Sequence, residues 1–317
     1  MPRTLLLLSL GLTFVIGGPL QAAEPKSSGG FRVRKFADRL EIALDGRPIA
    51  EYVFDDAQVR RPYLCRLRTP SGVQVTRNHP PTKGRDLDDH PTIHPGVWLA
   101  FGDLSGTDFW RNKGLVRHGE FKDEPTSRDD RLTFTAQNRY EAGDRTIADE
   151  TCGIEFVRRP DGYLIVWQST FQAGDDELVF GDQEEMGLGI RVATPLAVAS
   201  GGEIIDAAGR RNGKEVWGTQ SPWCRYGGTL DGRQVGLVLM PGPKNFSPAW
   251  FHARDYGLLV ANPFGRRAFT KKEPSRVVVQ PGETLVLRFG IRVYDLPAGA
   301  KFDAAAAYRE DSATLSP

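Results

Sequence analysis

Three features are scarce in this chain of 317 residues, and each scarcity excludes a class of protein. There are three cysteines, Cys65, Cys152 and Cys224, and none has the C-x-x-C spacing of a zinc ribbon or a thioredoxin-like motif. The sequence leaves open which pair would form a disulfide, or whether all three are buried free thiols. Charge of one sign is also lacking, because 41 basic residues balance 40 acidic ones. We therefore expect no nucleic-acid partner.

Long hydrophobic runs are limited to the beginning of the chain. Residues 5–16 are apolar, follow Arg3 and precede the small residues Ala22 and Ala23, which is the pattern of a signal peptide over residues 1–23. The run is shorter than the roughly 20 residues that span a bilayer, and no second run follows, so we expect no membrane span. The pattern predicts a periplasmic or secreted protein, with residues 24–30 as a flexible mature N-terminus.

Familiar catalytic signatures are missing as well. The chain contains no G-x-S-x-G, H-E-x-x-H, Walker A or Rossmann glycine pattern. These absences disfavour an α/β serine hydrolase, a zincin, an NTPase and a nicotinamide enzyme. A pair of glycosidase carboxylates stays open, because its spacing is set in three dimensions and leaves little trace in sequence.

Glycine and proline are abundant, with 35 and 22 residues, and they separate short runs rich in β-branched and aromatic residues. This pattern predicts an all-β fold, a large antiparallel β-sandwich that occupies residues 31–317 as a single domain. The clearest predicted strands are residues 39–44, 131–140, 163–173, 235–240 and 284–294. One short C-terminal helix is expected over residues 303–310, with Asp303 as its N-cap.

Residues 77–110 hold three of the five histidines and two of the six tryptophans. His90 and His94 are each followed by proline, which favours extended backbone, so they lie on a loop or an irregular edge. With Asp89 nearby, they are candidate metal ligands or an acid/base pair, or else they are hydrogen-bonded within an ordered polar loop. His79 is a weaker candidate of the same kind.

Other residues of this segment have a structural and a functional interpretation. Asp103 and Asp108 fall in a glycine-containing turn, where aspartates close turns by accepting bonds from their own backbone. Trp98 and Trp110 are expected in the core, unless one of them forms a platform on which a sugar stacks.

A second motif places Glu184 and Glu185 before the predicted strand 188–192. Because adjacent strand residues point to opposite faces, at most one of these glutamates should face a cleft. Arg191 shares the face of Glu185 in regular pairing. A glutamate held beside an arginine stays ionised with a lowered pKa, suited to accept a proton, although a plain ion pair is an equal alternative.

A third motif, WFHARDYG, alternates as a strand does, with His252 and Arg254 on one side and Asp255 on the other. His252 is the best partner for the histidines of the first cluster, or it is a satisfied core residue. Arg254 and Asp255 are candidates to hold hydroxyls or carboxylates, or they pair with their neighbours.

Three segments in this order carry a resemblance to a known family. They are DDHPTIHPGVWLAFGDLSGTDFWR (residues 88–111), EEMGLGIRVATPL (184–196) and AWFHARDYGLLVANPFG (249–265). They resemble the bacterial family named "methane oxygenase PmoA-like", and the resemblance covers almost all of the mature chain. It implies a sandwich similar in layout to the galactose-mutarotase-like supersandwich, in which His and Glu side chains on a concave face act on sugars.

Three functions follow as hypotheses. The first is an exported protein that acts on or binds carbohydrate, with His90, His94, His252 and Glu185 as catalytic residues and Arg191, Arg254, Asp255 and Trp110 in contact with a small-molecule or glycan ligand. The second is a non-catalytic glycan-binding module that stacks sugars on Trp98, Trp110 and Trp250. The third is a metal-dependent oxidase, which the family name implies to be a copper protein, with His90, His94 and His252 as ligands. The sequence identifies no cofactor and no oligomeric state.

Overall fold

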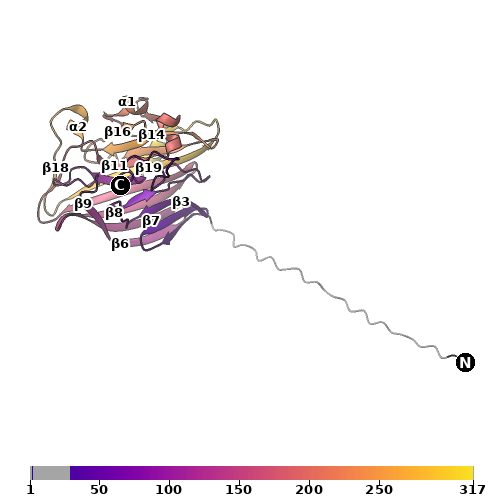
Figure 1. The fold of residues 1–317 in the computed structure, drawn as a ribbon, viewed down its shortest axis with the longest axis horizontal. Helices are drawn as coiled ribbons and strands as arrows, with labels where there is room; N and C mark the ends of the chain where they lie inside the picture. The colour runs from indigo at the N-terminus through magenta and orange to yellow at the C-terminus, as the bar shows by residue number, and fades with distance from the viewer. Residues whose placement is uncertain (1, 3–28, 317) are drawn as a thin grey trace.

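The computed structural model describes residue 2 and residues 29–316, and strands dominate this part of the chain (Figure 1). The predicted signal peptide, apart from residue 2, and residues 24–28 of the predicted flexible N-terminus lie outside the described residues. Within the described ranges, no helix combines the length and the apolar character needed to cross a membrane.

The first sheet contains nine strands in the order β1-β2-β3-β4-β5-β11-β17-β16-β13, and every pairing in it is antiparallel. The strands are β1 (Phe31–Lys35), β2 (Arg39–Leu44), β3 (Arg47–Val53), β4 (Tyr63–Cys65), β5 (Val97–Phe101), β11 (Met186–Arg191), β13 (Thr219–Gln220), β16 (Trp250–Arg254) and β17 (Leu258–Asn262).

The second sheet contains eight antiparallel strands in the order β12-β14-β15-β19-β9-β8-β7-β6. They are β6 (Leu115–Arg128), β7 (Arg131–Ala142), β8 (Arg145–Arg159), β9 (Gly162–Ala173), β12 (Glu203–Asp206), β14 (Cys224–Leu230), β15 (Arg233–Pro241) and β19 (Thr284–Pro297). Strands β10 (Leu178–Phe180) and β18 (Val277–Val279) form a separate pair. The short helices are η1 (Thr194–Leu196), η2 (Val198–Ser200), α1 (Asn212–Val216), α2 (Arg266–Thr270) and α3 (Ala304–Ser312).

The two sheets pack face to face around one apolar core. Strand β7 shows why, because every second residue from Leu132 to Tyr140 is buried, including Phe134, while the residues that alternate with them are exposed or partly exposed. These side chains join one hydrophobic cluster with residues of the first sheet, such as Leu99 and Ile190. The prediction of an all-β antiparallel sandwich is confirmed.

The predicted C-terminal helix and its cap are also confirmed. Helix α3 begins after Asp303, whose carboxylate accepts a hydrogen bond from the Ala306 amide at 2.9 Å. The three cysteines are buried, and the structure pairs none of them in a disulfide.

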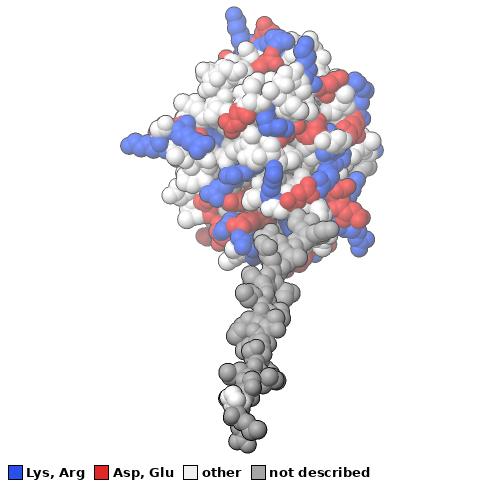
Figure 2. Space-filling view, turned by 90° about the vertical axis from the view of Figure 1, so that its right-hand side faces the viewer, with Lys and Arg blue, Asp and Glu red and all other residues white. Residues whose placement is uncertain are grey.

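The outer face of the first sheet carries the three motifs side by side. Trp98 on β5, Gly189 on β11, Val260 on β17 and His252 on β16 are in register across four neighbouring strands, so their side-chain positions share one face. The loop before β5 and the segment after it cover part of this face, and a second apolar cluster that includes Trp98 and Val260 forms beneath them. Acidic and basic side chains are interspersed over the side of the molecule shown in Figure 2.

Candidate functional site

The loop that carries His90 and His94 is held by a buried arginine at its base. Arg77 donates from Nη1 to the carbonyls of Leu87 at 2.9 Å and Asp89 at 2.7 Å, and from Nη2 to those of His90 at 3.3 Å and His94 at 3.0 Å. Arg77 is 1% exposed, so these charge-assisted bonds form away from water. One guanidinium therefore sets the shape of the loop through its backbone.

A second buried arginine joins this loop to the segment that follows β5. Arg61 donates to the carbonyl of Ile93 at 2.5 Å and to that of Trp110 at 3.0 Å. Burial lowers the pKa of Arg61 to about 9, which still leaves it charged at neutral pH. Together with Arg77, it makes the histidine loop part of the rigid frame.

Asp89 and His90 form a hydrogen-bonded pair anchored by Arg191. His90 Nδ1 lies 2.8 Å from Asp89 Oδ2, and Arg191 donates to both oxygens of that carboxylate, at 2.9 Å and 2.6 Å. Burial raises the pKa of Asp89, but the bonds from Arg191 and His90 outweigh it and hold that pKa well below its usual range. The Asp89 carboxylate is therefore the hydrogen-bond acceptor, and His90 Nδ1 is the donor. In the part of the chain that the structure describes, Nε2 has no partner, and the His90 side chain is 47% exposed.

His94 lies behind His90 and is buried. Its ring stacks on His90 with centroids 4.7 Å apart and on Trp98 at 5.0 Å. Burial, followed by the charge of Arg191, lowers the pKa of His94 to about 2, so the ring is neutral at neutral pH. Arg191 Nη1 lies 3.5 Å from His94 Nδ1, which is consistent with Nδ1 as the acceptor nitrogen.

Asp89, His90 and His94 are the group that the geometry offers to a metal, with donor atoms within 4.8 Å of one another. The copper that the family name implies does not fit this arrangement. Arg191 Nη1 donates to Asp89 Oδ2 and also lies next to His94 Nδ1, so a fixed positive charge occupies the space between these two donors. His252 on β16, the third expected ligand, instead faces Glu184, with its Nε2 3.6 Å from Glu184 Oε2.

His252 belongs to a second polar group on the same face. Its Nδ1 donates to the Glu184 carbonyl at 3.3 Å, and Arg254 Nη2 donates to Glu184 Oε2 at 3.0 Å. Burial, with Arg254, lowers the pKa of His252 to about 4, so this imidazole is also neutral at neutral pH. His252 and Arg254 share one side of β16, as the sequence pattern predicts.

Glu185 pairs with Arg111 at 3.1 Å, and the expected contact between Glu185 and Arg191 is absent from the described structure. Six residues along a strand span about 20 Å, which is too far for an ion pair even on a shared face. Glu184 and Glu185 both precede β11, which begins at Met186, so the strand alternation behind the prediction that at most one of them faces a cleft does not apply to them.

Most of the remaining predicted residues have structural roles. Asp103 accepts a bond from the Gly106 amide at 3.1 Å and Asp108 from the Arg111 amide at 2.9 Å, which confirms them as turn residues. Asp255 lies in the turn between β16 and β17, where it accepts a bond from an amide of α1 at 2.7 Å. His79 packs edge-on against a tyrosine outside both polar groups.

The tryptophans expected as sugar platforms are largely inaccessible. Trp98 and Trp110 are 0% and 1% exposed, which confirms the core interpretation. They cross each other with ring centroids 5.2 Å apart. Trp250 is half-buried and stacks loosely on Phe269. Only Trp250 of the three retains a partly exposed surface.

Sequence reasoning missed Tyr256, which lies between the two polar groups. The Arg191 guanidinium is 4.5 Å from the centre of its ring. Burial raises the pKa of its phenol, the charges of Arg191 and Arg254 lower it, and those of Asp89 and Glu185 raise it. The phenol therefore lies within electrostatic reach of both groups. Its position in a D-Y-G turn gives no sign of chemistry, because only the strand register brings it there.

Arg191 and Arg254 show how close the groups are. Both are in register with Leu258, one on each side of β17, so their backbones are two strand spacings apart, about 10 Å. The three motifs thus meet on one face, with neutral imidazoles and carboxylates held by arginines.

Comparison with solved structures finds several distant likenesses. The Slr1438 protein from Synechocystis sp. PCC 6803 is 14% identical with a TM-score of 0.33, and the match covers 90% of this chain and 99% of that one. A galactose mutarotase related enzyme from Lactobacillus acidophilus is 10% identical with a TM-score of 0.35, covering 86% and 100%. A Glycoside Hydrolase Family 97 enzyme from Pseudoalteromonas sp. strain K8 is 10% identical with a TM-score of 0.35, covering 83% and 34%.

Among curated proteins, none matches this chain. The sequence does match one family over most of its length, and the matched residues include all three motifs of the site. On that match over residues 39–308, the chain belongs to the Family of unknown function (DUF6807).

Proposed function

We propose that this protein, exported from the cell, binds a carbohydrate on the outer face of the nine-stranded sheet and transfers protons on it. The observation that carries the proposal is the position of Tyr256, whose ring centre lies 4.5 Å from the Arg191 guanidinium and 6.5 Å from the centre of the His90 ring. The charges of Arg254 and Glu185 also act on the pKa of its phenol. A polar ligand in contact with this phenol would reach both groups. Sugar hydroxyls both donate and accept hydrogen bonds, which suits such a mixed site.

The Asp89 and His90 pair supplies the acid. An ionised carboxylate bonded to Nδ1 orients the ring and stabilises the imidazolium, so Nε2 is the nitrogen that exchanges a proton with the ligand. His90 is the exposed member of the histidine group, whereas His94 is buried and neutral and supports the ring from behind. In ring opening, Nε2 gives its proton to the ring oxygen while the bond from that oxygen to the anomeric carbon breaks.

Glu185 is the complementary base. Its carboxylate lies 3.1 Å from Arg111, and its side chain is 30% exposed, so it retains access to a ligand. It accepts the proton of the anomeric hydroxyl in ring opening. In glycoside hydrolysis it accepts the proton of the attacking water, while Nε2 of His90 gives its proton to the departing glycosidic oxygen and the bond from that oxygen to the anomeric carbon breaks. Arg254, held by Glu184, is placed to bond a hydroxyl of the same sugar.

The test is turnover by the purified protein. Polarimetry measures it on a panel of aldoses, and release of reducing sugar measures it on a panel of glycosides. Variants H90Q and E185Q should lower kcat by roughly 100-fold to 10,000-fold, the usual contribution of a general acid or base, with sugar binding retained. D175N is the matched control, because it changes an exposed carboxylate in the loop between β9 and β10 that belongs to neither polar group.

Two results would contradict the proposal. One is a wild-type protein that turns over none of the sugars, and the other is an H90Q variant as active as D175N. Binding that depends on His90 without turnover would assign the same face to a non-catalytic glycan-binding module.

A further inference from the structure

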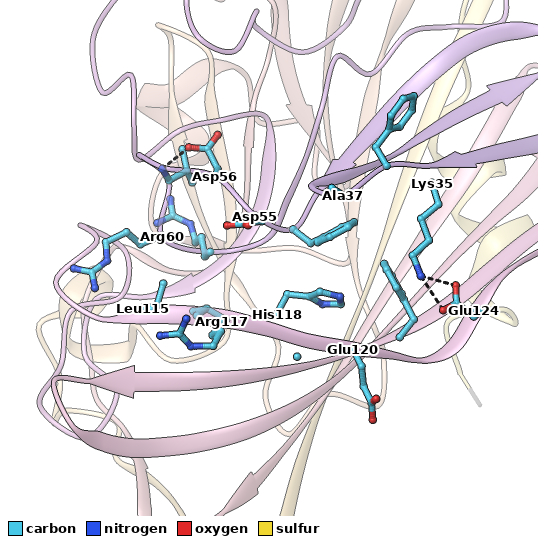
Figure 3. Close-up of a pocket in the computed structure, with 17 residues that line it drawn as sticks. Lys35, Ala37, Asp55, Asp56, Arg60, Leu115, Arg117, His118, Glu120 and Glu124 are labelled. Carbon is cyan, nitrogen blue, oxygen red and sulfur yellow. Dashed lines mark hydrogen bonds and ion pairs between the residues drawn. The ribbon is translucent and has the colours of Figure 1, made fainter.

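A separate pocket of about 620 Å³ lies where the first turns of the nine-stranded sheet meet the edge strand β6. Figure 3 shows His118 near its centre, with Arg60 and Arg117 on one side and the Lys35–Glu124 ion pair on the other. Its volume is within the range of pockets that hold small molecules. None of the proposed proton-transfer residues lines it.

The wall of this pocket is aromatic around a single imidazole. The His118 ring lies 4.6 Å from that of Phe54 and 4.7 Å from that of Phe121, measured between centroids, and the two phenyl rings meet edge to face at 5.3 Å. Such rings offer an apolar surface with one polar atom set into it. This combination favours a ligand with an apolar face and polar edges.

The rim carries both charges. Basic Arg60 and Arg117 are matched by acidic Asp55 and Glu120, and all four are exposed. Arg117 is already paired with a glutamate of β7. A rim with both signs gives no net preference for an anion or a cation, whereas neutral hydroxyls bond to either kind of group.

A buried polar row runs from the pocket into the sandwich. His118, Asn138 and Glu150 are in register across β6, β7 and β8. Asn138 Nδ2 donates to Glu150 Oε2 at 3.0 Å, and Ser169 donates to the other carboxylate oxygen. Asn138 and Glu150 are each 4% exposed, and burial raises the pKa of Glu150. Polar groups inside an apolar core are costly, which makes their alignment behind His118 a sign of function.

The row ends in polar atoms whose bonding capacity is not met. Asn138 Oδ1, His118 Nδ1 and the Tyr52 hydroxyl are buried without a hydrogen-bond partner among the described residues. Asn138 influences the pKa of both Tyr52 and His118, so the three side chains are close together. Because the Asn138 amide nitrogen donates to Glu150, the Asn138 oxygen is the atom left to accept a hydrogen bond on the His118 side. An imidazole bonded through Nδ1 would keep Nε2 as an acceptor for a ligand hydroxyl.

We propose that this pocket is a second carbohydrate-binding site, in which a sugar ring packs against Phe54 and Phe121 and its hydroxyls bond to His118 and the charged rim. The site accepts the ligand through His118, which the buried row of Asn138 and Glu150 orients from behind. This inference goes beyond the proposed function and does not depend on turnover at the outer face.

The experiment is an NMR titration of the histidine ring signals with maltose, cellobiose and lactose in turn. At least one disaccharide should shift the His118 signals saturably, in the wild type and equally in H90Q. Removing the stacking surface in F121A should weaken that binding by roughly tenfold, about 1.4 kcal/mol. F246A, which truncates an exposed phenylalanine elsewhere, should leave it unchanged.

A rim substitution keeps the test independent of folding. D55N changes an exposed side chain at the same pocket and should weaken binding by a few fold with an unchanged circular dichroism spectrum. The proposal is overturned if none of the three sugars shifts His118, if the shift is unaffected in both F121A and D55N, or if it disappears in H90Q. Saturable shifts in a protein without turnover would leave this site standing while the proposed function fails.

Discussion

Replacing Gly189 by alanine tests whether the packing of the two indoles holds the histidine loop in place. A β-carbon at Gly189 would lie 2.6 Å from Trp98 Cζ2 and 3.1 Å from Trp110 Cη2. Carbon atoms prefer about 3.5 to 4.0 Å, so Trp98 must move by about 1 Å. Overpacking of this kind costs about 1–3 kcal/mol, against which alanine recovers about 0.5–1 kcal/mol of the entropy that glycine loses in a strand. We expect G189A to lose about 1–2 kcal/mol of unfolding free energy.

The assay is equilibrium unfolding in urea, with G153A as the matched control. Gly153 is also a strand glycine, but the nearest atom to an added β-carbon there is 3.9 Å away, so G153A should be neutral or slightly stabilising. Because His94 stacks on Trp98, G189A should also shift the His94 ring signals, whereas G153A should not. Equal stability of the two variants would refute the packing argument.

Three further predictions concern the frame of the site and of the fold. R77K should lower the free energy of unfolding by about 2–4 kcal/mol, because an ammonium cannot reproduce the four hydrogen bonds from Arg77 to loop carbonyls. Limited proteolysis should then cut within residues 82–88, and a loop that resists cleavage in the variant would contradict this. Burial lowers the pKa of His94 to about 2 and those of His79 and His252 to about 4. As the pH falls below about 6.5, the three imidazoles become protonated in the unfolded chain but stay neutral in the folded protein. The free energy of unfolding should therefore fall from pH 6.5 toward pH 4 by about 1.4 kcal/mol per pH unit for each imidazole. Urea unfolding at pH 7, 6 and 5 measures this slope, and a flat profile would disprove it. D303A should lose about 0.5–2 kcal/mol through its helix cap, visible as a lower urea midpoint, while D303N should retain most of it.

The sequence predicts the sandwich well because its signals are local. Residues 39–44 form β2 with the predicted bounds, and residues 163–173 fall in β9, because alternation and turn residues are properties of neighbouring positions. The helix cap at Asp303 follows for the same reason. What a short stretch cannot encode is which strands become neighbours.

The site depends on those long-range pairings, and there the predictions succeed only in part. His90, His94 and Asp89 are close in sequence and come together as expected. The partner of Glu185 is Arg111 and not Arg191. Glu185 precedes β11, and the six residues from Glu185 to Arg191 span about 20 Å, which is too far for an ion pair. Tyr256 is invisible to motif reasoning, since its neighbours are set by β11, β16 and β17 together.

The contact of Arg191 with Asp89 and His94 means that the chain carries its own permanent counter-ion. A guanidinium does not titrate at physiological pH and does not dissociate, so the charge of the histidine site is independent of the metal content of its surroundings. A chain with a neutral residue in place of Arg191 would present Asp89, His90 and His94 without that counter-ion.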